Sequence, residues 1–393
     1  MSGQASPPLR IAAYQEAAVT SYRGPMGELD FPLLGLFGET GSLLSVVKKK
    51  QRDRKATGYT LAVIEELGDV LWYFTMVARS AGLSLCVLAN NVGRGLSDWS
   101  NDAAEELTFE AIQEMPNVIQ LEPTESFEKT LLNLAGEVGT LLADFQSGKL
   151  NHNQPAIAGR LVAVLRILVK AADDVGVTLE QAAEANLKKI FDRWPRERKF
   201  PPPFDEGAKE FEKLPRYLVV EIFERDVRNQ TYVFQKCNGI NLGDRLTDNA
   251  ATPDDYRFHD VFHYAYAAVL GWSPVLRALM RLKRKSEPDI DEAQDGARAI
   301  LIEEGIATWI FGQAKGMRLF ENIQPGELSF DLLKSVRQFV SGYEPEHSPL
   351  WLWEDAILQG YDAFRFLKKN RRARLILDMS KRRLSVEELP LES

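Results

Sequence analysis

Acidic residues at helical spacing, placed on two consecutive helical patterns, constrain this chain of 393 residues more than any other feature. The first pattern contains Glu39 and Ser42, and the second contains Glu66 and Asp69, so the members of each pair are three positions apart. Residues at this spacing share one face of a helix. Carboxylates that face each other from neighbouring helices repel unless a divalent cation such as Mg²⁺ or Mn²⁺ lies between them. The pattern therefore predicts metal-assisted attack of water on a phosphoanhydride.

At these residues, and over about residues 10–195, the chain resembles the MazG-like, all-α nucleoside triphosphate pyrophosphohydrolases. The family motif is Glu-x-x-Glu, a spacer and Glu-x-x-Asp, on the two central helices of a four-helix fold. The strings Gly38–Gly41 and Glu65–Tyr73 are similar to its two halves. Ser42 departs from the family pattern, which has its second glutamate there. A lost charge lowers metal affinity, because ligand charge sets binding strength.

The chain also repeats itself, since Leu36–Leu44 returns as Leu134–Leu142. Internal repeats of this kind predict tandem helical hairpins that bury their apolar faces on each other, as two subunits of a homodimer would. The second copy keeps Glu137, but it has Arg160 where the first copy has Glu66. We therefore expect the second copy to be degenerate and unable to form the same cation site.

Four residues are candidate nucleotide contacts. The resemblance implies that Asn186 and Lys189 match the C-terminal Asn-x-x-Lys contact of the family and reach a nucleotide held over the first copy. Asn91 is the counterpart of Asn186 in the repeat. Lys48 belongs to a basic cluster that follows Glu39 and could face phosphates. The alternative for these positions is a solvated helix end.

The predicted fold is mainly α, with tandem MazG-like helical hairpins that form a bundle and a C-terminal, mostly helical domain that contains a small β-hairpin. Prolines concentrated after residue 195 predict an exposed linker. Beyond the linker, alternating β-branched and aromatic residues predict the hairpin, and helical patterns follow to about residue 385. The expected domains are a first copy at 1–115, a degenerate second copy at 116–195, a linker at 196–215 and a metal-binding hydrolase domain at 216–393.

Composition narrows the classes of partner. The net charge of −8 argues against general nucleic-acid binding. No apolar run approaches the roughly 18 residues of a membrane span, and the first residues lack a signal-peptide pattern. Cys86 and Cys237 stand apart, which fits a reducing cytosol. These features predict a cytoplasmic protein with a nucleotide substrate and no membrane partner, and they are compatible with a homo-oligomer.

Two of the four histidines, His259 and His263, lie four residues apart in the C-terminal half. This spacing places both imidazoles on one helix face, where they can bind a single transition-metal ion. Glu303 and Glu304, on a later helical pattern, would complete the ligand set for Zn²⁺, Mn²⁺ or Fe²⁺. Asp260 stands where zinc peptidases have their catalytic glutamate. The His-Asp pair is also similar to that of the metal-dependent His-Asp phosphohydrolases. The structural alternative is that both histidines belong to an aromatic core.

The leading hypothesis is a metal-dependent nucleoside triphosphate pyrophosphohydrolase. Glu39, Glu66 and Asp69 would hold Mg²⁺ or Mn²⁺, and Glu65 would orient or deprotonate the attacking water. A second metal-dependent hydrolase domain would use Asp260 as its catalytic residue. One alternative is a nucleotide-sensing scaffold with little turnover and a C-terminal effector. Another alternative is a zinc-peptidase-like activity in the C-terminal domain.

Overall fold

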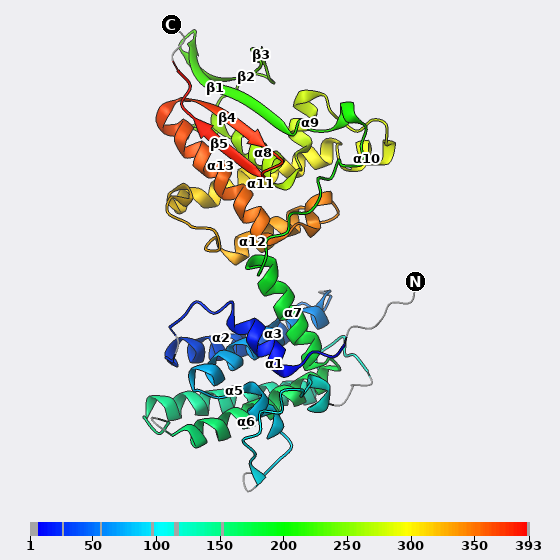
Figure 1. The fold of residues 1–393 in the computed structure, drawn as a ribbon, viewed down its shortest axis with the longest axis vertical. Coiled ribbons are helices and arrows are strands. Elements are labelled where there is room, and N and C mark those ends of the chain that lie inside the picture. The colour runs from blue at the N-terminus through cyan, green and yellow to red at the C-terminus, as the bar shows by residue number, and fades with distance from the viewer. Residues whose placement is uncertain are drawn as a thin grey trace. The chain divides into compact units, whose positions relative to one another are not determined.

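The computed structural model describes residues 7–25, 27–55, 57–95, 98–113, 118–150 and 153–390. The chain divides into two compact units, Met1–Phe191 and Asp192–Ser393, and we describe each by itself (Figure 1). The described residues are mainly helical, and the strands all fall in the second unit. Every helix among these residues is too short or too polar to cross a lipid bilayer.

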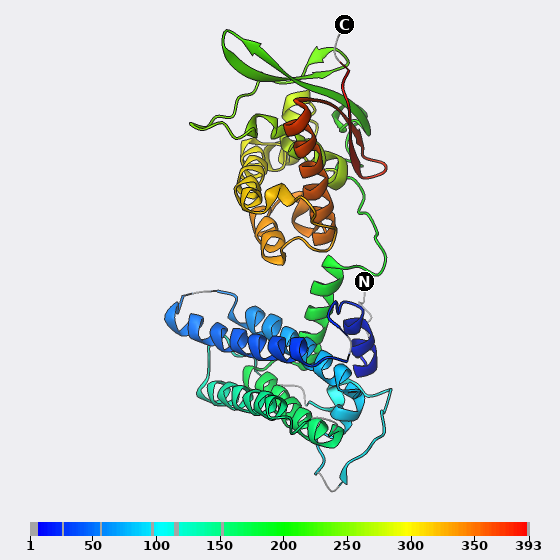
Figure 2. The same cartoon turned by 90° about the vertical axis from the view of Figure 1, so that its left-hand side faces the viewer.

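The first unit is built from helices, of which four are long. The long helices α2, α3, α5 and α6 lie side by side in Figures 1 and 2, with α2 packed on α3 and α5, and α6 packed on α5 and α3. Their apolar faces meet in one core that includes the fully buried Leu36, Leu67, Leu134 and Leu165. The helices are α1 (Ile11–Val19), α2 (Asp30–Arg52), α3 (Tyr59–Ser80), α4 (Leu85–Asn90), the 3₁₀ turn η2 (Phe109–Ala111), α5 (Glu125–Gln146), α6 (Gln154–Val175) and α7 (Leu179–Arg193).

Two glycines on these helices allow close approaches that larger residues would block. A Cβ atom added to Gly35 of α2 would lie 1.9 Å from the ring of Tyr73 on α3. A Cβ atom added to Gly68 of α3 would lie 2.6 Å from the carbonyl oxygen of Ala182 on α7. Gly68 therefore lets the backbone of α7 pack directly on α3, beside Asp69.

The second unit combines an antiparallel sheet with buried helices. The strands are β1 (Tyr217–Val227), β2 (Gln230–Cys237), β3 (Ile240–Asn241), β4 (Arg372–Asp378) and β5 (Arg383–Glu387). The helices are α8 (Asp260–Ala265), α9 (Pro274–Met280), α10 (Pro288–Ala293), α11 (Ala297–Gly316), α12 (Phe330–Phe339) and α13 (Leu350–Asn370). Shorter turns are η3 (Glu210–Glu212), η4 (Tyr256–Phe258), the π-helix η5 (Tyr266–Leu270), η6 (Arg318–Phe320) and η7 (Glu344–His347).

The sheet has the strand order β3-β2-β1-β4-β5 and is larger than the sequence predicts. The expected hairpin is confirmed as β1 and β2, which pair Phe223 with Phe234. The expectation of helix to about residue 385 is wrong, because residues 372–387 form β4 and β5. Val220 of β1 pairs with Leu375 of β4, and both side chains are buried on the inner face of the sheet.

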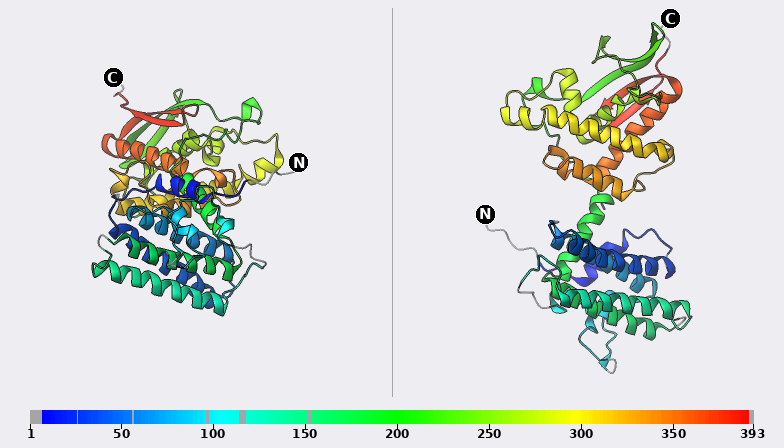
Figure 3. Two further views of the ribbon diagram at one scale, coloured as in Figure 1. Left: turned by 60° about the horizontal axis from the view of Figure 1, so that its bottom comes forward. Right: turned by 180° about the vertical axis from the view of Figure 1, so that it is seen from behind.

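Helix α8 lies at the centre of the second unit. It continues into η5, and all residues from Asp260 to Leu270 are buried. Helices α13 and α11 both pack against α8, and α13 also packs against β4 and β5. Figures 2 and 3 show α11, α12 and α13 on the same side of the sheet. This arrangement places the His259–His263 segment next to α11.

Residues 196–215, which we expect from the sequence to be an exposed linker, are instead partly built into the second unit. Asp205 is fully buried and accepts hydrogen bonds from Arg216 and Arg277, each at 2.7 Å. The backbone amide of Leu214 donates to the same carboxylate at 2.8 Å. Arg277 lies 72 positions further along the chain, so Asp205 anchors this segment to the second unit.

Replacement of Gly68 by Ala tests the close packing of α7 on α3. We expect the free energy of unfolding to fall by about 1 to 3 kcal/mol, because the new methyl group would overlap the Ala182 carbonyl. Gly136→Ala on α5 is the matched control, since a Cβ atom there meets nothing within 4 Å. The control should gain up to about 1 kcal/mol from helix propensity. Urea denaturation measures both; equal stability of Gly68→Ala and wild type would contradict the close approach.

Candidate functional site

Three carboxylates converge at the edge of the apolar face of α3. Glu39 comes from α2, and Glu66 and Asp69 come from α3, and each offers an oxygen atom within 4.8 Å of the other two. They converge because Leu67 and Val70 are buried in the core, which turns the neighbouring acids toward α2. The structure thus brings together the three residues that the sequence predicts as ligands for Mg²⁺ or Mn²⁺.

The proximity of these acids changes their protonation. Burial, together with the charges of Asp69, Glu39 and Glu65, raises the pKa of Glu66 to about 7. Burial and the charge of Asp69 also raise the pKa of Glu39. A divalent cation would relieve this repulsion, and carboxylate oxygens are the ligands that Mg²⁺ and Mn²⁺ prefer. The donor set therefore fits such an ion.

Helix α7 places an ammonium and an amide beside the cluster. The Nζ atom of Lys189 lies 2.5 Å from Oδ2 of Asp69 and 3.5 Å from Oε1 of Glu65. The amide of Asn186 donates to Oδ1 of Asp69 at 3.1 Å. The hydroxyl of Tyr14 donates in turn to Asn186 Oδ1 at 3.3 Å. Both oxygens of Asp69 are thus held in place by α7, and Tyr14 is a supporting residue that the sequence does not reveal.

Ser42 and Glu65 lie at the margin of the same cluster. Burial raises the pKa of Glu39, and hydrogen bonding by Ser42, three residues further along α2, lowers it in part. The side chain of Glu65 is 36% exposed, so it can reach solvent from the edge of the site.

The other two predicted nucleotide contacts do not join the cluster. The Asn91 side chain is buried; its amide donates to the Val87 and Ser100 carbonyls, and its oxygen accepts from the Ser100 amide. Asn91 therefore stabilises a loop. Lys48 follows Glu39 by nine residues on α2, which at 100° per residue places it on the opposite side of the helix. Neither residue joins the cluster, and their contacts with a nucleotide stay predictions.

Helices α5 and α6, the second helical hairpin of the first unit, carry ion pairs around Arg160. Arg160 of α6 lies 2.8 Å from Asp144 and 3.8 Å from Glu137, both on α5. The hydroxyl of Thr140 donates to the backbone carbonyl of Gly136 at 2.8 Å. Arg160 is the residue that the sequence repeat aligns with Glu66, so a cation beside Glu137 would meet a positive charge.

A second cluster forms in the other unit, where α8 meets α11. His259, Asp260 and His263 each offer a ligand atom within 4.8 Å of the other two. Glu304 lies beside them, with Oε2 at 3.4 Å from Nε2 of His263 and at 3.8 Å from Nε2 of His259. Although burial opposes it, Glu303 and Glu304 raise the pKa of His263 well above its ordinary value.

Two roles in this cluster differ from the sequence prediction. Glu303 is fully buried behind His263, and its oxygens accept hydrogen bonds from Ser273, Val275 and the His263 ring. We expect Glu303 to be a metal ligand from the sequence, but these hydrogen bonds make it a support for His263. Asp260, the predicted catalytic residue, lies among the candidate ligands, with Oδ1 at 3.2 Å from His259 Nε2.

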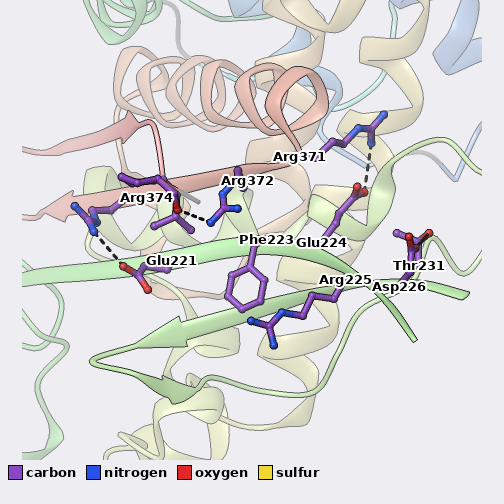
Figure 4. Close-up of a pocket in the computed structure, with 11 residues that line it drawn as sticks. Glu221, Phe223, Glu224, Arg225, Asp226, Thr231, Arg371, Arg372 and Arg374 are labelled. Atoms are coloured by element: carbon purple, nitrogen blue, oxygen red, sulfur yellow. Dashed lines mark hydrogen bonds and ion pairs between the residues drawn. The ribbon is translucent and has the colours of Figure 1, made fainter. Parts of the chain in front are cut away.

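The outer face of the sheet carries a hollow of about 800 Å³ (Figure 4). Its charged side chains mostly pair with each other, as Arg374 does with Glu221 at 3.1 Å and Arg371 with Glu224 at 3.4 Å. Arg225 lies over the ring of Phe223, with its guanidinium carbon 4.9 Å from the ring centre. This hollow is polar, and these lining charges already form ion pairs with each other, so they are not available to a charged ligand.

Comparison with protein-family models matches residues 199–390 to the MazG C-terminal domain. This match relates the C-terminal part of the chain to the MazG family, although the sequence motifs point to that family from the N-terminal part. The resemblance of residues 10–195 stays a prediction. Comparison with curated proteins and comparison with solved structures found no match.

The raised pKa of Glu66 predicts a pH-dependent stability in the absence of metal. Because the folded-state pKa of about 7 exceeds the ordinary value of 4.5, wild type loses stability as pH rises from about 4.5 to about 7. Glu66→Gln has no charge to acquire, so it should match wild type near pH 5 and be the more stable at pH 8. Thermal unfolding in a chelator measures the difference, about 2 to 4 °C for each kcal/mol. A constant difference across this pH range would show that Glu66 is not under such repulsion.

Proposed function

We propose that the first unit hydrolyses nucleoside triphosphates between the α and β phosphates, to give a nucleoside monophosphate and pyrophosphate. The observation that carries this proposal is the convergence of Glu39, Glu66 and Asp69 within 4.8 Å on facing helices. The match of residues 199–390 to the MazG C-terminal domain supports a relation to this class of enzyme. The base and the sugar are left open.

Glu39, Glu66 and Asp69 would hold Mg²⁺ or Mn²⁺. When bound, the ion would offset the charge of the phosphates and polarise the phosphoanhydride. The need for an ion is electrostatic, because an acidic cluster alone would repel a polyphosphate. Among the residues described around the cluster, Lys189 forms an ion pair with Asp69 at 2.5 Å.

Glu65 is the proposed general base. Its position at the exposed edge of the cluster allows a carboxylate oxygen to meet a water molecule that approaches from solvent. Its Oε1 atom also lies 3.5 Å from the Lys189 ammonium. Glu65 would thus take the proton as water attacks phosphorus.

Lys189 and Asn186 are the proposed phosphate contacts. Both are hydrogen-bond donors on α7, and both now donate to Asp69. A cation that binds Asp69 would compete for its oxygens and free these donors for the substrate. The ammonium would then lie next to the phosphates, where its charge favours the anion.

We further propose that α2–α3 and α5–α6 are two copies of one MazG-like hairpin, the second of them degenerate. The second copy lacks two of the acids of the first, and Arg160 there pairs with Glu137 and Asp144 while the core stays packed. This contact supports the proposal. One copy would then hold the ion, and the other would complete the bundle.

A specific observation favours a second candidate, a nucleotide sensor with little turnover. Ser42 brings no charge to the cluster, and the ion pair of Lys189 with Asp69 at 2.5 Å already compensates one of the acids. Such a site would bind a nucleotide weakly through the same residues, and the C-terminal unit would be the effector.

Glu66→Gln tests the proposed activity. The change removes a charge and keeps the shape, so pyrophosphate release with Mg²⁺ or Mn²⁺ should fall roughly 100-fold or more, since even supporting residues of metal sites are worth 10- to 100-fold. Glu184→Gln, an exposed position on α7, is the matched control and should leave turnover unchanged. A panel of common and modified triphosphates identifies the substrate.

The same assay separates the two candidates. Absence of pyrophosphate release from every triphosphate, together with nucleotide binding that Glu66→Gln abolishes, would establish the sensor. Turnover that survives in Glu66→Gln would remove this cluster from the reaction.

Ser42→Glu tests the missing fourth acid. Because Ser42 faces Glu39, the added carboxylate should tighten Mg²⁺ binding roughly tenfold, or about 1.4 kcal/mol. Thr140→Glu is the matched control at the corresponding position of the second hairpin, where Arg160 should absorb the new charge. Titration calorimetry measures both variants. Weaker Mg²⁺ binding by Ser42→Glu than by wild type would count against a four-acid site.

A further inference from the structure

We propose that His259, Asp260, His263 and Glu304 form a mononuclear centre for a divalent transition-metal ion in the second unit. The centre is independent of the proposed pyrophosphohydrolase activity, because its residues come from the start of α8 and from α11. Ligand atoms of His259, Asp260 and His263 lie within 4.8 Å of one another, and Glu304 contacts both imidazoles. Four side chains of suitable chemistry therefore converge on one point.

The hydrogen bonds of the two rings decide which nitrogen can bind a metal. Nδ1 of His259 lies 2.9 Å from the carbonyl oxygen of Tyr256, which can only accept a hydrogen bond. Nδ1 of His263 lies 2.9 Å from Oε1 of Glu303, which is a buried acceptor. Both Nδ1 atoms therefore carry a proton, so Nε2 is the nitrogen of each ring that offers a lone pair to a metal ion, once it is deprotonated.

The surroundings of Glu303 fix the orientation of His263. Oε1 of Glu303 accepts from the Ser273 hydroxyl at 2.7 Å, and Oε2 accepts from the Val275 amide at 2.8 Å. The side chain of Glu303 has no solvent-exposed surface. A carboxylate that holds the far nitrogen of a histidine is the usual support of a metal-binding imidazole.

The Nε2 atom of His263 lacks a hydrogen-bond partner, although it is buried and its side chain is 1% exposed. A buried polar atom left in this way costs free energy, and most such atoms in proteins are paired. The atom points toward Glu304, beside His259 and Asp260. Oε2 of Glu304 lies 3.4 Å away, and a metal ion at this point would be bound by both groups.

Asp260 is held from behind by residues of the sheet and of its own helix. Its Oδ2 atom accepts a hydrogen bond from the amide of Gln235 on β2, and the oxygen of Gln235 accepts one from the hydroxyl of Tyr264. Gln235 is 2% exposed and lies on the inner, otherwise apolar face of the strand. These hydrogen bonds hold Oδ2 of Asp260, and Oδ1 faces Nε2 of His259 at 3.2 Å.

Charge also favours a cation here. Asp260, Glu303 and Glu304 bring three carboxylates to a mostly buried place, and among the described residues no lysine or arginine forms an ion pair with them. A divalent ion would supply the missing positive charge. Two imidazole nitrogens with carboxylate oxygens suit Zn²⁺, Fe²⁺, Mn²⁺ or Co²⁺ and do not suit Mg²⁺ or Ca²⁺.

The exposure of the four side chains shows where an exogenous ligand would approach. His259, Asp260 and His263 are at most 10% exposed in their side chains, but that of Glu304 is 37% exposed. A water molecule or an anionic oxygen would therefore enter along Glu304. The π-helix η5, which directly follows α8, is a feature that often accompanies functional sites.

Metal analysis of the full-length protein tests the centre. Protein purified without chelators, after removal of any histidine tag, should contain about one transition-metal ion per chain by mass spectrometry. Protein stripped of metal and reloaded with Co²⁺ should show visible absorption from cobalt bound by nitrogen. His263→Ala and Asp260→Asn should lose the ion and the absorption. His347→Ala, an exposed histidine of the same unit, is the matched control and should retain both.

Two further variants make the result specific. Glu303→Gln should keep the ion but weaken its binding by roughly 10- to 100-fold, as expected of a positioning residue. Glu66→Gln should keep the ion fully, which separates this centre from the carboxylate cluster of the first unit. If the variants do not fold, as circular dichroism would show, the wild-type protein still decides the question. Wild type without stoichiometric transition metal, and without cobalt absorption after reloading, would overturn the proposal.

Discussion

Like charges held a few ångström apart are the constraint on which the carboxylate cluster of the first unit depends. Two such charges at 4 Å repel by about 4 kcal/mol at an effective dielectric constant of 20, so only a rigid frame keeps them together. In the first unit, the buried stripe of α3, which includes Leu67 and Phe74, fixes Glu66 and Asp69 against α2. In the second unit, the buried helix α8 fixes Asp260 beside His259 and His263. Packing of the core thus keeps mutually repelling carboxylates together, and a bound cation would reduce their repulsion.

Local spacing was sufficient to find the groups that converge. Glu66 and Asp69 share a face of α3, and His259 and His263 lie one turn apart at the start of α8, because helical geometry fixes these relations within a single element. The mainly helical fold and the first hairpin of the sheet also follow from local patterns. Lys48 stays a predicted nucleotide contact, although nine residues amount to two and a half turns and place it away from Glu39 on α2.

Contacts between distant parts of the chain account for the rest. Glu303 and Glu304 are neighbours in the sequence, and only the packing of α11 against α8 decides which of them supports His263 and which faces the open side. The sequence did not predict strand β4, because arginines alternate with its apolar residues. The strand pairs with β1, and its apolar inner face is buried against helices. Gln235 could have indicated a buried polar site from the sequence, because a polar side chain at an inward position of a strand needs a buried partner.

The packing of both hairpins within one chain also has a consequence for behaviour on dilution. A bundle assembled from two separate chains loses its partner as concentration falls, because its stability depends on mass action. Here α2 packs on α5, and both helices belong to one polypeptide. The second hairpin is therefore present at a fixed effective concentration. The frame that holds Glu39, Glu66 and Asp69 together therefore needs no second molecule. The geometry of this cluster should be the same in a cell with a few copies of the protein as in a concentrated solution.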